Sequence, residues 1–135
     1  MREAIYYYLS NFAGLTSLVG SRIYPQRVPT GKGLPYLSFT LSNRQPNYDQ
    51  DGYDEWNTVF FEFECVATTL KEASDVANQL FNAWDIQFQD IGDTTKIYVH
   101  STTLESDFDD DDLFDGSEDG YRKITQTYSI RYKES

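Results

Sequence analysis

The chain has 135 residues, of which 39% are hydrophobic, so it is long enough for one ordinary domain with a single core. Its formal net charge of -11 and its pI of about 4.3 argue against nucleic-acid wrapping and against attraction to anionic lipid, because both depend on clustered Lys and Arg. Aromatic residues make up 16% of the chain and include eleven Tyr, which is a common interface residue. We therefore expect part of this aromatic excess to contact other protein chains.

The start of the chain lacks the apolar core of a signal peptide, and no apolar run approaches membrane-spanning length. The single cysteine, Cys65, cannot form an intramolecular disulfide, and it falls at an inward-facing position of a predicted strand. We therefore expect a buried thiol in a protein that is made and used in a reducing cytoplasm and does not enter a membrane.

The chain opens with a predicted helix and an extended connector. A short second helical turn follows the first helix, and Gly20 is placed to end it in a left-handed cap. Residues 21–35 contain three prolines and two glycines, which preclude a helix and predict an extended path. The apolar face of the first helix consists of Ile5, Tyr8, Leu9 and Phe12.

Two strands are predicted in the next part of the chain. Residues 36–42 alternate, with Leu37, Phe39 and Leu41 on the presumed core face. Residues 43–55 then read as a long loop, because the separation exceeds that of a tight hairpin turn. The second strand covers residues 56–67, and its buried face is Val59, Phe61, Phe63, Cys65 and Ala67.

A second helix follows this strand at once. Thr68 or Thr69 can cap it, and Glu72 stands three residues after Thr69, as in a capping box. Its apolar residues recur at steps of three and four and predict one buried stripe against the preceding strand. That stripe consists of Leu70, Ala73, Val76, Ala77, Leu80, Phe81 and Trp84.

The last third of the chain contains two further predicted strands. Residues 85–93 are ambiguous and end in a Gly-Asp turn, while β-branched residues predict a third strand over residues 94–104. A dense acidic tract occupies residues 105–120. The fourth strand is predicted over residues 121–133, with Ile124, Tyr128, Ile130 and Tyr132 on one face.

These elements predict a single α+β domain over residues 1–135. The expected order is α-β-β-α-β-β, which implies a four-stranded antiparallel sheet with the helices packed on one face.

No metal site is predicted. Asn47, Asp49, Asp51 and Gly52 occupy the first, third, fifth and sixth positions of an EF-hand-like loop. However, the twelfth position is Thr58 where a bidentate Glu is needed, and strands rather than helices flank the segment. The later acidic tract has oxygen ligands without fixed spacing, which permits only weak, nonspecific binding of divalent cations.

No enzyme or cofactor site is predicted either. His100 is the only histidine, and nothing near it in sequence supplies the nucleophile and partner of a triad. Lys32 lies between two glycines, but the spacing does not match a Walker loop. A small hydrolase or calcium-responsive regulator based on the acidic loops remains an alternative of another class, and calcium titration calorimetry would discriminate it.

Three stretches resemble the tail-completion proteins of long-tailed bacteriophages, which are also called tail terminator or tail-to-head joining proteins. The first combines Val19-Gly20 with Arg22-Ile23-Tyr24-Pro25 and then Leu34-Pro35-Tyr36. The second is the strand and Ala-rich helix at residues 61–67 and 71–77, and the third is the terminal strand at residues 123–130. The loop at 43–55 and the acidic tract after Asp107 match no motif of the family.

The resemblance implies a structural virion protein that binds without catalysis. Members cap the head-proximal end of the tail tube as a six-membered ring at the tail–neck junction, after assembly in the host cytoplasm. The implied partners are further copies of the chain, the tail tube protein and the head connector or head-closure protein, while DNA passes through without specific binding. The copies could form the ring in solution or stay monomeric until the tube end templates them. The alternative is a head-closure, neck or minor tail protein that binds the connector.

Two sets of residues are candidates for contact with partners. Tyr48, Tyr53 and Trp56 are aromatic residues in or beside the predicted loop, and we expect them at an interface with other copies or partners. The run of Asp109, Asp110, Asp111 and Asp112 could face the lumen of a ring and repel passing DNA, or it could be a solvated outer loop.

Overall fold

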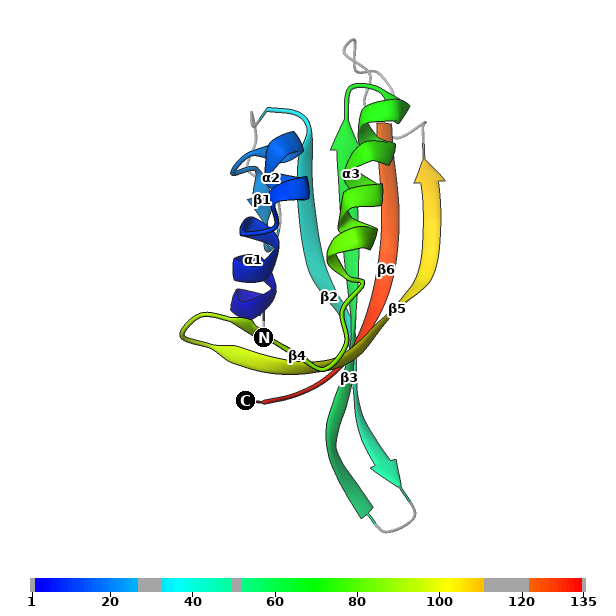
Figure 1. Ribbon diagram of the computed structural model, residues 1–135. Helices are drawn as coiled ribbons and strands as arrows, with labels where there is room; N and C mark the ends of the chain where they lie inside the picture. The colour runs from blue at the N-terminus through cyan, green and yellow to red at the C-terminus, as the bar shows by residue number, and fades with distance from the viewer. Residues whose placement is uncertain (1, 27–32, 50–51, 111–121, 135) are drawn as a thin grey trace.

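The protein is an α+β domain in which helices pack on a strongly curled sheet. A computed structural model, shown in Figure 1, describes residues 2–26, 33–49, 52–110 and 122–134. Within these ranges the chain forms three helices and one six-stranded sheet. Their order is α1 (Arg2–Ser10), α2 (Ala13–Val19), β1 (Ile23–Tyr24), β2 (Tyr36–Asp49), β3 (Gly52–Ala67), α3 (Leu70–Ala83), β4 (Gln89–Gly92), β5 (Lys96–Asp110) and β6 (Arg122–Glu134).

The sheet is mixed and has the strand order β1-β2-β3-β6-β5-β4. Strand β1 runs parallel to β2, and every other neighbouring pair is antiparallel. The prediction of a purely antiparallel sheet is therefore wrong at β1. The connector between β1 and β2 is long enough to carry the chain back to the starting end of the sheet, as a parallel pair requires.

The prediction of four strands in the order α-β-β-α-β-β is also wrong, because β1 and β4 were not expected. Strand β1 has two residues and β4 has four, and such short segments cannot show the alternation of a buried strand. Both lie at the ends of the sheet, where pairing with a longer neighbour is enough to hold them.

Residues 43–49 and 52–55 are strand, so the prediction of a long loop over residues 43–55 is wrong for these residues. They form the outer part of a long β2–β3 hairpin that extends away from the helices in Figure 1. Tyr48 pairs with Tyr53 and Asp49 with Gly52, and the register shifts between Leu41 and Asn43 and again between Pro46 and Tyr48. The segment is rich in polar residues, so its sequence lacks apolar alternation, yet backbone pairing satisfies its hydrogen bonds.

The predicted core is largely confirmed. All five residues named for the inner face of β3 are buried, as are Ile124, Tyr128, Ile130 and Tyr132 of β6. Helix α3 packs on β3 and β6, as Figure 1 shows, and the Thr69 hydroxyl oxygen accepts the Glu72 N–H at 3.2 Å, as the capping box predicts. Three residues assigned to the core are exposed instead, namely Leu41, Leu70 and Phe81.

The acidic tract begins as strand. Strand β5 continues through Asp110, so residues 105–110 belong to the sheet, where pairing with β6 outweighs the weak strand preference of Asp.

Helix α2 is followed by Gly20, whose φ of 59° is in the range that favours glycine. Among the described residues, no helix combines the length and hydropathy that crossing a membrane requires.

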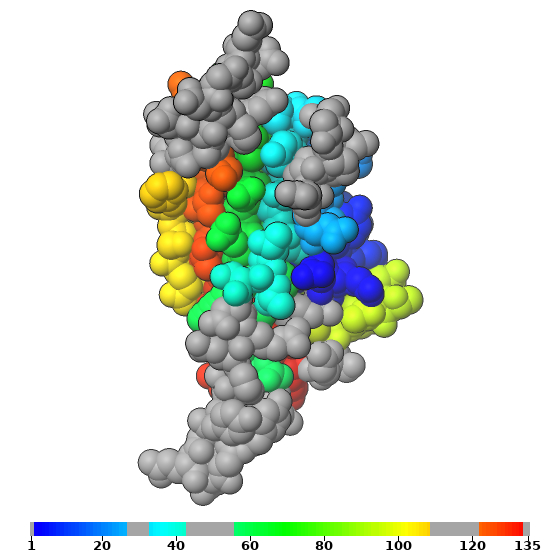
Figure 2. Space-filling model, turned by 180° about the vertical axis from the view of Figure 1, so that it is seen from behind, coloured from blue at the N-terminus to red at the C-terminus, as the bar shows by residue number. Residues whose placement is uncertain are grey.

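One face of the sheet carries no helix. Figure 2 shows β2, β3, β6 and β5 side by side on this face. Its side chains are mainly polar, including Thr40, Glu62 and Thr127, which stand in one row across three strands. Lys123 pairs with Glu64 at 3.1 Å on the same face. We call this surface the helix-free face.

The thiol of Cys65 is expected to be inert in the folded protein. The residue is fully buried, and burial raises the pKa of the thiol, with smaller contributions from the charges of Asp107 and Glu64. Because the thiolate is the reactive form, a maleimide should label Cys65 only after unfolding. A Ser17→Cys variant, whose added thiol lies on exposed α2, should be labelled at once. Equal labelling rates of the two thiols in folded protein would contradict this prediction.

Candidate functional site: an aromatic and cationic patch at the hairpin base

Trp56 lies at the base of the β2–β3 hairpin and belongs to a cluster on the helix-free face. The row Asn57, Tyr132 and Val99 crosses β3, β6 and β5 on the core side of the sheet, with Tyr132 and Val99 buried. Because side chains alternate along a strand, the adjacent residues Trp56, Lys133 and Tyr98 point to the opposite face. We call this cluster the Trp56 patch, and it consists of Trp56, Phe88, Tyr98, His100, Arg131 and Lys133.

Two cations lie over the indole ring of Trp56. The Lys133 ammonium nitrogen is 5.0 Å from the ring centroid, and it is also 5.8 Å from the centroid of Tyr98. The guanidinium carbon of Arg131 is 5.9 Å from the indole centroid. Contacts of this kind contribute about 0.5–1 kcal/mol each at exposed sites. The patch therefore holds positive charge in a fixed position on a chain whose net charge is -11.

His100 connects Trp56 to the exposed Phe88. Its ring centroid lies 5.1 Å from that of Trp56 and 4.8 Å from that of Phe88, both in edge-on arrangements. The His100 Nδ1 atom is 3.0 Å from the Ser101 hydroxyl. Phe88 is 59% exposed and has a φ of 51°, an uncommon conformation for a side chain of this size. The backbone thus presents a large aromatic ring to solvent at the rim of the patch.

The other residues predicted for partner contact lie elsewhere. Tyr48 and Tyr53 occupy opposite positions on the hairpin, so the structure pairs their backbones and places Trp56 on the same strand as Tyr53. Asp109 and Asp110 are at the far end of β5 from the patch, opposite Ile124 and Lys123 of β6. Asp111 and Asp112 lie outside the described residues, and the roles assigned to all seven positions stay predictions.

Sequence reasoning found Trp56 and missed the other members of the patch. Tyr98 and His100 alternate along one strand, and Arg131 and Lys133 alternate along another. That alternation is visible in the sequence and places each pair on one face. The pairing of Lys133 with Tyr98 depends on the register of β5 and β6, which the sequence does not reveal.

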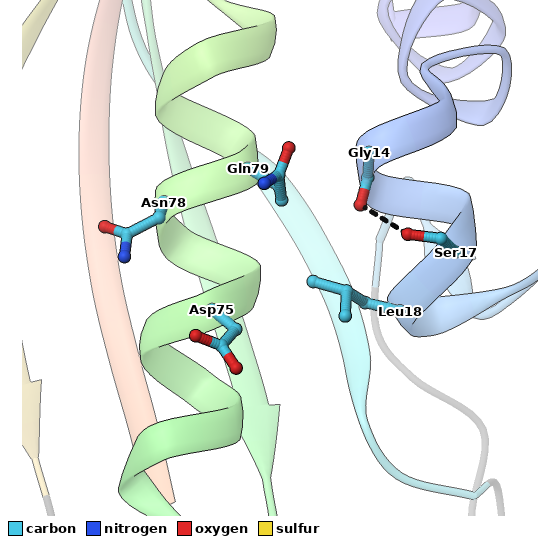
Figure 3. A pocket seen from close by; sticks show the side chains of 6 residues that line it. All are labelled: Gly14, Ser17, Leu18, Asp75, Asn78 and Gln79. Atoms are coloured by element: carbon cyan, nitrogen blue, oxygen red, sulfur yellow. Dashed lines mark hydrogen bonds between the residues drawn. The ribbon is translucent and has the colours of Figure 1, made fainter.

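Apart from the Trp56 patch, a concave region lies between α2 and α3 (Figure 3). It has a volume of about 240 Å³ and is open and mainly polar, with Asp75 already paired to Lys71 at 3.2 Å. The Ser17 hydroxyl donates to the Gly14 carbonyl at 3.1 Å, as Figure 3 shows, so it is engaged within its own helix. Its lining residues are Gly14, Ser17, Leu18, Asp75, Asn78 and Gln79.

The composition of the Trp56 patch is that of a binding surface. Across the described ranges, no three His, Cys, Asp or Glu side chains group in a way that could hold a metal ion. Residues 47–49 and 52–58, which suggested an EF-hand loop, are strand residues of the hairpin. The Trp56 patch instead combines exposed aromatic area with cations, which is the composition of protein interfaces.

Comparison with known proteins identifies the family. The model of the family described as "Tail completion protein gp17" matches residues 3–133, which is nearly the whole chain. The chain belongs to this family. The predicted resemblance to phage tail-completion proteins is therefore confirmed, and the family is one of structural virion proteins.

The fold also has a counterpart among solved structures. A chain from the structure titled "Virion of native gene transfer agent (GTA) particle" superposes with a TM-score of 0.69. The superposition covers 100% of this tail completion protein and 95% of that chain, at 19% sequence identity, and it demonstrates a common fold. No curated protein was found to match the sequence.

Proposed function

We propose that this tail completion protein forms a ring on the head-proximal end of the phage tail tube, ends tube growth and joins the tail to the head connector. The family match over residues 3–133 carries the proposal. The helices and strands that carry the family motifs contribute residues to a common hydrophobic core, which supports the proposal. The proposed partners are further copies of the chain, the tail tube protein and the connector or head-closure protein.

We propose the β2–β3 hairpin and the Trp56 patch as the surface that contacts the tube or the connector. The hairpin projects from the domain in Figure 1, so it can reach a neighbouring protein without moving the core. The patch at its base combines an indole ring with the charges of Arg131 and Lys133. Trp and Arg are enriched among the residues that dominate binding energy at interfaces, and cations fixed on an acidic chain favour an acidic partner surface.

The proposed channel role concerns charge. A ring of chains with a net charge of -11 each would repel DNA, so DNA could pass without adhering to the wall. The helix-free face, with Glu62 and Glu64, and the acidic end of β5 are the two candidate linings. The lumen-facing role of Asp109 to Asp112 stays a prediction beside the alternative of a solvated outer surface.

The experiment is negative-stain electron microscopy of a phage lysate that lacks this gene, with purified protein added back. We expect DNA-filled heads beside unjoined or overlong tails, and whole infectious particles after addition of the protein. Normal particles without the protein would overturn the proposed function. Tails of normal length beside heads that have lost their DNA would instead indicate the head-closure position.

The same assay tests the Trp56 patch. Trp56→Ala protein should restore at least about tenfold fewer whole particles than the natural protein, because an interface Trp typically contributes 2 kcal/mol or more. Trp56→Phe should restore an intermediate number. Tyr7→Ala is the matched control, since Tyr7 is an aromatic residue of α1 that is 43% exposed and outside the patch. Full restoration by Trp56→Ala protein, with circular dichroism matching the natural protein, would exclude the patch from the contact.

A further inference from the structure

Strand β2 has an outer edge that no described strand covers beyond Ser38. Strand β1 pairs with it only at Leu37 and Ser38. The Leu37 N–H donates to the Arg22 carbonyl at 3.0 Å. The backbone N–H and C=O groups of Leu37 therefore point outward, away from β3. Backbone groups alternate between the two sides of a strand, so the N–H and C=O groups of Phe39 and Leu41 also point outward. The short strand β1 therefore covers only the first part of this edge of β2.

Strand β5 has a corresponding edge towards the other end of the sheet. Strand β4 pairs with residues 96–99, and the Phe88 N–H donates to the His100 carbonyl at 3.2 Å. Beyond His100, no described strand lies on this side of β5. The register of β5 against β6 shifts between Val99 and Ser101 and again between Leu104 and Ser106. Between these two shifts the strand alternates regularly, and the backbone groups of Thr102 and Leu104 point outward. An exposed strand edge is a template for pairing with another chain.

The β5 edge adjoins a small pocket, lined by both apolar and polar side chains, that one copy of the chain leaves open. The pocket has a volume of about 90 Å³, and at its rim Phe81 is 51% exposed. Trp84 is buried, yet its indole Nε1 has no hydrogen-bond partner among the described residues. The pocket is lined by Phe81, Trp84, Asp85, Thr102, Leu104 and Tyr128.

The β2 edge carries an exposed apolar side chain on the matching face. Leu41 follows the buried Leu37 and Phe39 at steps of two, so it points to the side of the sheet on which α3 packs. It is nevertheless 38% exposed. The Thr102 hydroxyl donates to the Trp84 carbonyl, so the side chains of the β5 edge turn to the same side of the sheet. Each edge therefore has apolar surface beside it that a single copy does not cover.

We propose that the sheet continues from one copy of the chain to the next, and that Leu41 of one copy packs over the pocket beside Phe81 of its neighbour. In this contact the outer edge of β2 pairs with the outer edge of β5, and the occupant of each edge is a second copy of this chain. The inference rests on the proposed ring and assigns the surfaces that build it.

The directions of the strands suit this contact. Three antiparallel steps lead from β2 through β3 and β6 to β5, so β2 and β5 run in opposite directions. Rotation about an axis along the strands preserves strand direction, so the two edges meet antiparallel in neighbouring copies. The edges are different surfaces, which makes the contact heterologous, and a heterologous contact closes into a ring when the rotation allows. Repulsion between acidic copies opposes this association away from the tube end.

Cysteine cross-linking tests the contact. The double variants Leu41→Cys with Leu104→Cys, and Leu41→Cys with Thr102→Cys, place thiols on both edges, while the natural Cys65 is buried. Residues opposite each other in an antiparallel pair have Cα atoms about 5.5 Å apart, which suits a disulfide. Within one copy the two edges are three strand spacings apart, or about 14 Å, so only contact between copies can link them.

The cross-linking is run on concentrated protein, with and without unfinished tails from the lysate that lacks the gene. We expect a reducible ladder of oligomers from one of the double variants, at least tenfold stronger than from either single variant. Absence of the ladder from both double variants, with and without tails, would overturn the edge contact. If the natural protein nevertheless restores whole particles, the proposed function stands and only the edge assignment is wrong.

A charge on the β2 edge provides the second test. Leu41→Lys places an ammonium group where the neighbour's pocket should receive an apolar side chain, and it should reduce the number of restored particles at least tenfold. Thr40→Lys is the matched control, because it adds the same charge one residue away on the helix-free face. Circular dichroism verifies that both variants fold. Equal restoration by the two variants would contradict the assigned contact.

Discussion

Replacing Phe63 with Ala is expected to destabilise the domain by about 3–5 kcal/mol, the usual cost of removing a fully buried Phe. The ring is 0% exposed and lies at the centre of an aromatic cluster. Its centroid is 5.4 Å from that of Phe39, 5.6 Å from that of Tyr128 and 6.0 Å from that of Trp84. The substitution therefore leaves a cavity between the sheet and α3 that these large neighbours cannot fill. Urea unfolding followed by tryptophan fluorescence measures the change.

Phe108→Ala is the control for this measurement. Phe108 is 61% exposed, so its removal should change the free energy of unfolding by less than about 1 kcal/mol. Similar losses from the two variants would mean that the aromatic cluster around Phe63 does not form the centre of the core.

Gly92→Ala is expected to destabilise the domain by about 2–4 kcal/mol, because it combines backbone strain with overpacking. Gly92 ends β4 with a φ of 113°, which residues with a side chain rarely adopt. An added Cβ would overlap the backbone carbonyl oxygen of Thr95 and lie 3.0 Å from the Cβ of Ala4. The Thr95 oxygen belongs to the turn between β4 and β5, and Ala4 is a fully buried residue of α1. Thermal or urea unfolding gives the measurement.

Gly14→Ala provides the matched comparison. The added Cβ would meet the flexible end of the half-buried Gln79 side chain and, at 2.9 Å, a ring carbon of Phe12, and both side chains can shift. Ala also favours the helix over Gly by about 1 kcal/mol. We expect its free energy of unfolding to stay within about 1 kcal/mol of that of the natural protein. If Gly92→Ala is equally mild, the turn between β4 and β5 adjusts and the strain argument fails.

The strands and the helix with strong periodicity could be predicted from the sequence. The inner face of β3 alternates over five residues, and each of them is buried. The Thr69 cap and the stripe of α3 were equally clear, because a helix with one buried face repeats its apolar residues at a fixed step. Leu70 and Phe81 were misplaced because they lie at the border of that stripe, where side chains are only partly covered.

The hairpin and the edge strands could not be predicted, because their stability comes from backbone pairing. The outer parts of β2 and β3 are rich in polar residues, and their sequence resembles that of a loop. Strand β4 and the acidic end of β5 are held by neighbours that lie elsewhere in the chain. Such segments become strands only once the partner strand is in place.

The candidate site shows the same division. Trp56 stood out in the sequence as an aromatic residue beside polar ones, but its cationic partners come from β6 and its aromatic partners from β5. Three strands that are distant in sequence build the Trp56 patch, and the register of their pairing decides which side chains meet. The uncovered edges of β2 and β5 likewise exist because the strand order places these strands next to the short end strands β1 and β4, which cover only part of each edge.

By itself, the sequence determined the class of fold, the central strand and helix, the buried thiol position and the resemblance to phage tail-completion proteins. These features depend on residues that are close together in the chain, so local periodicity and short motifs are enough to reveal them. The tertiary structure alone decided the strand order, the long hairpin, the Trp56 patch and the two open edges. These depend on register and on contacts between distant segments, which the local pattern of a single chain does not encode.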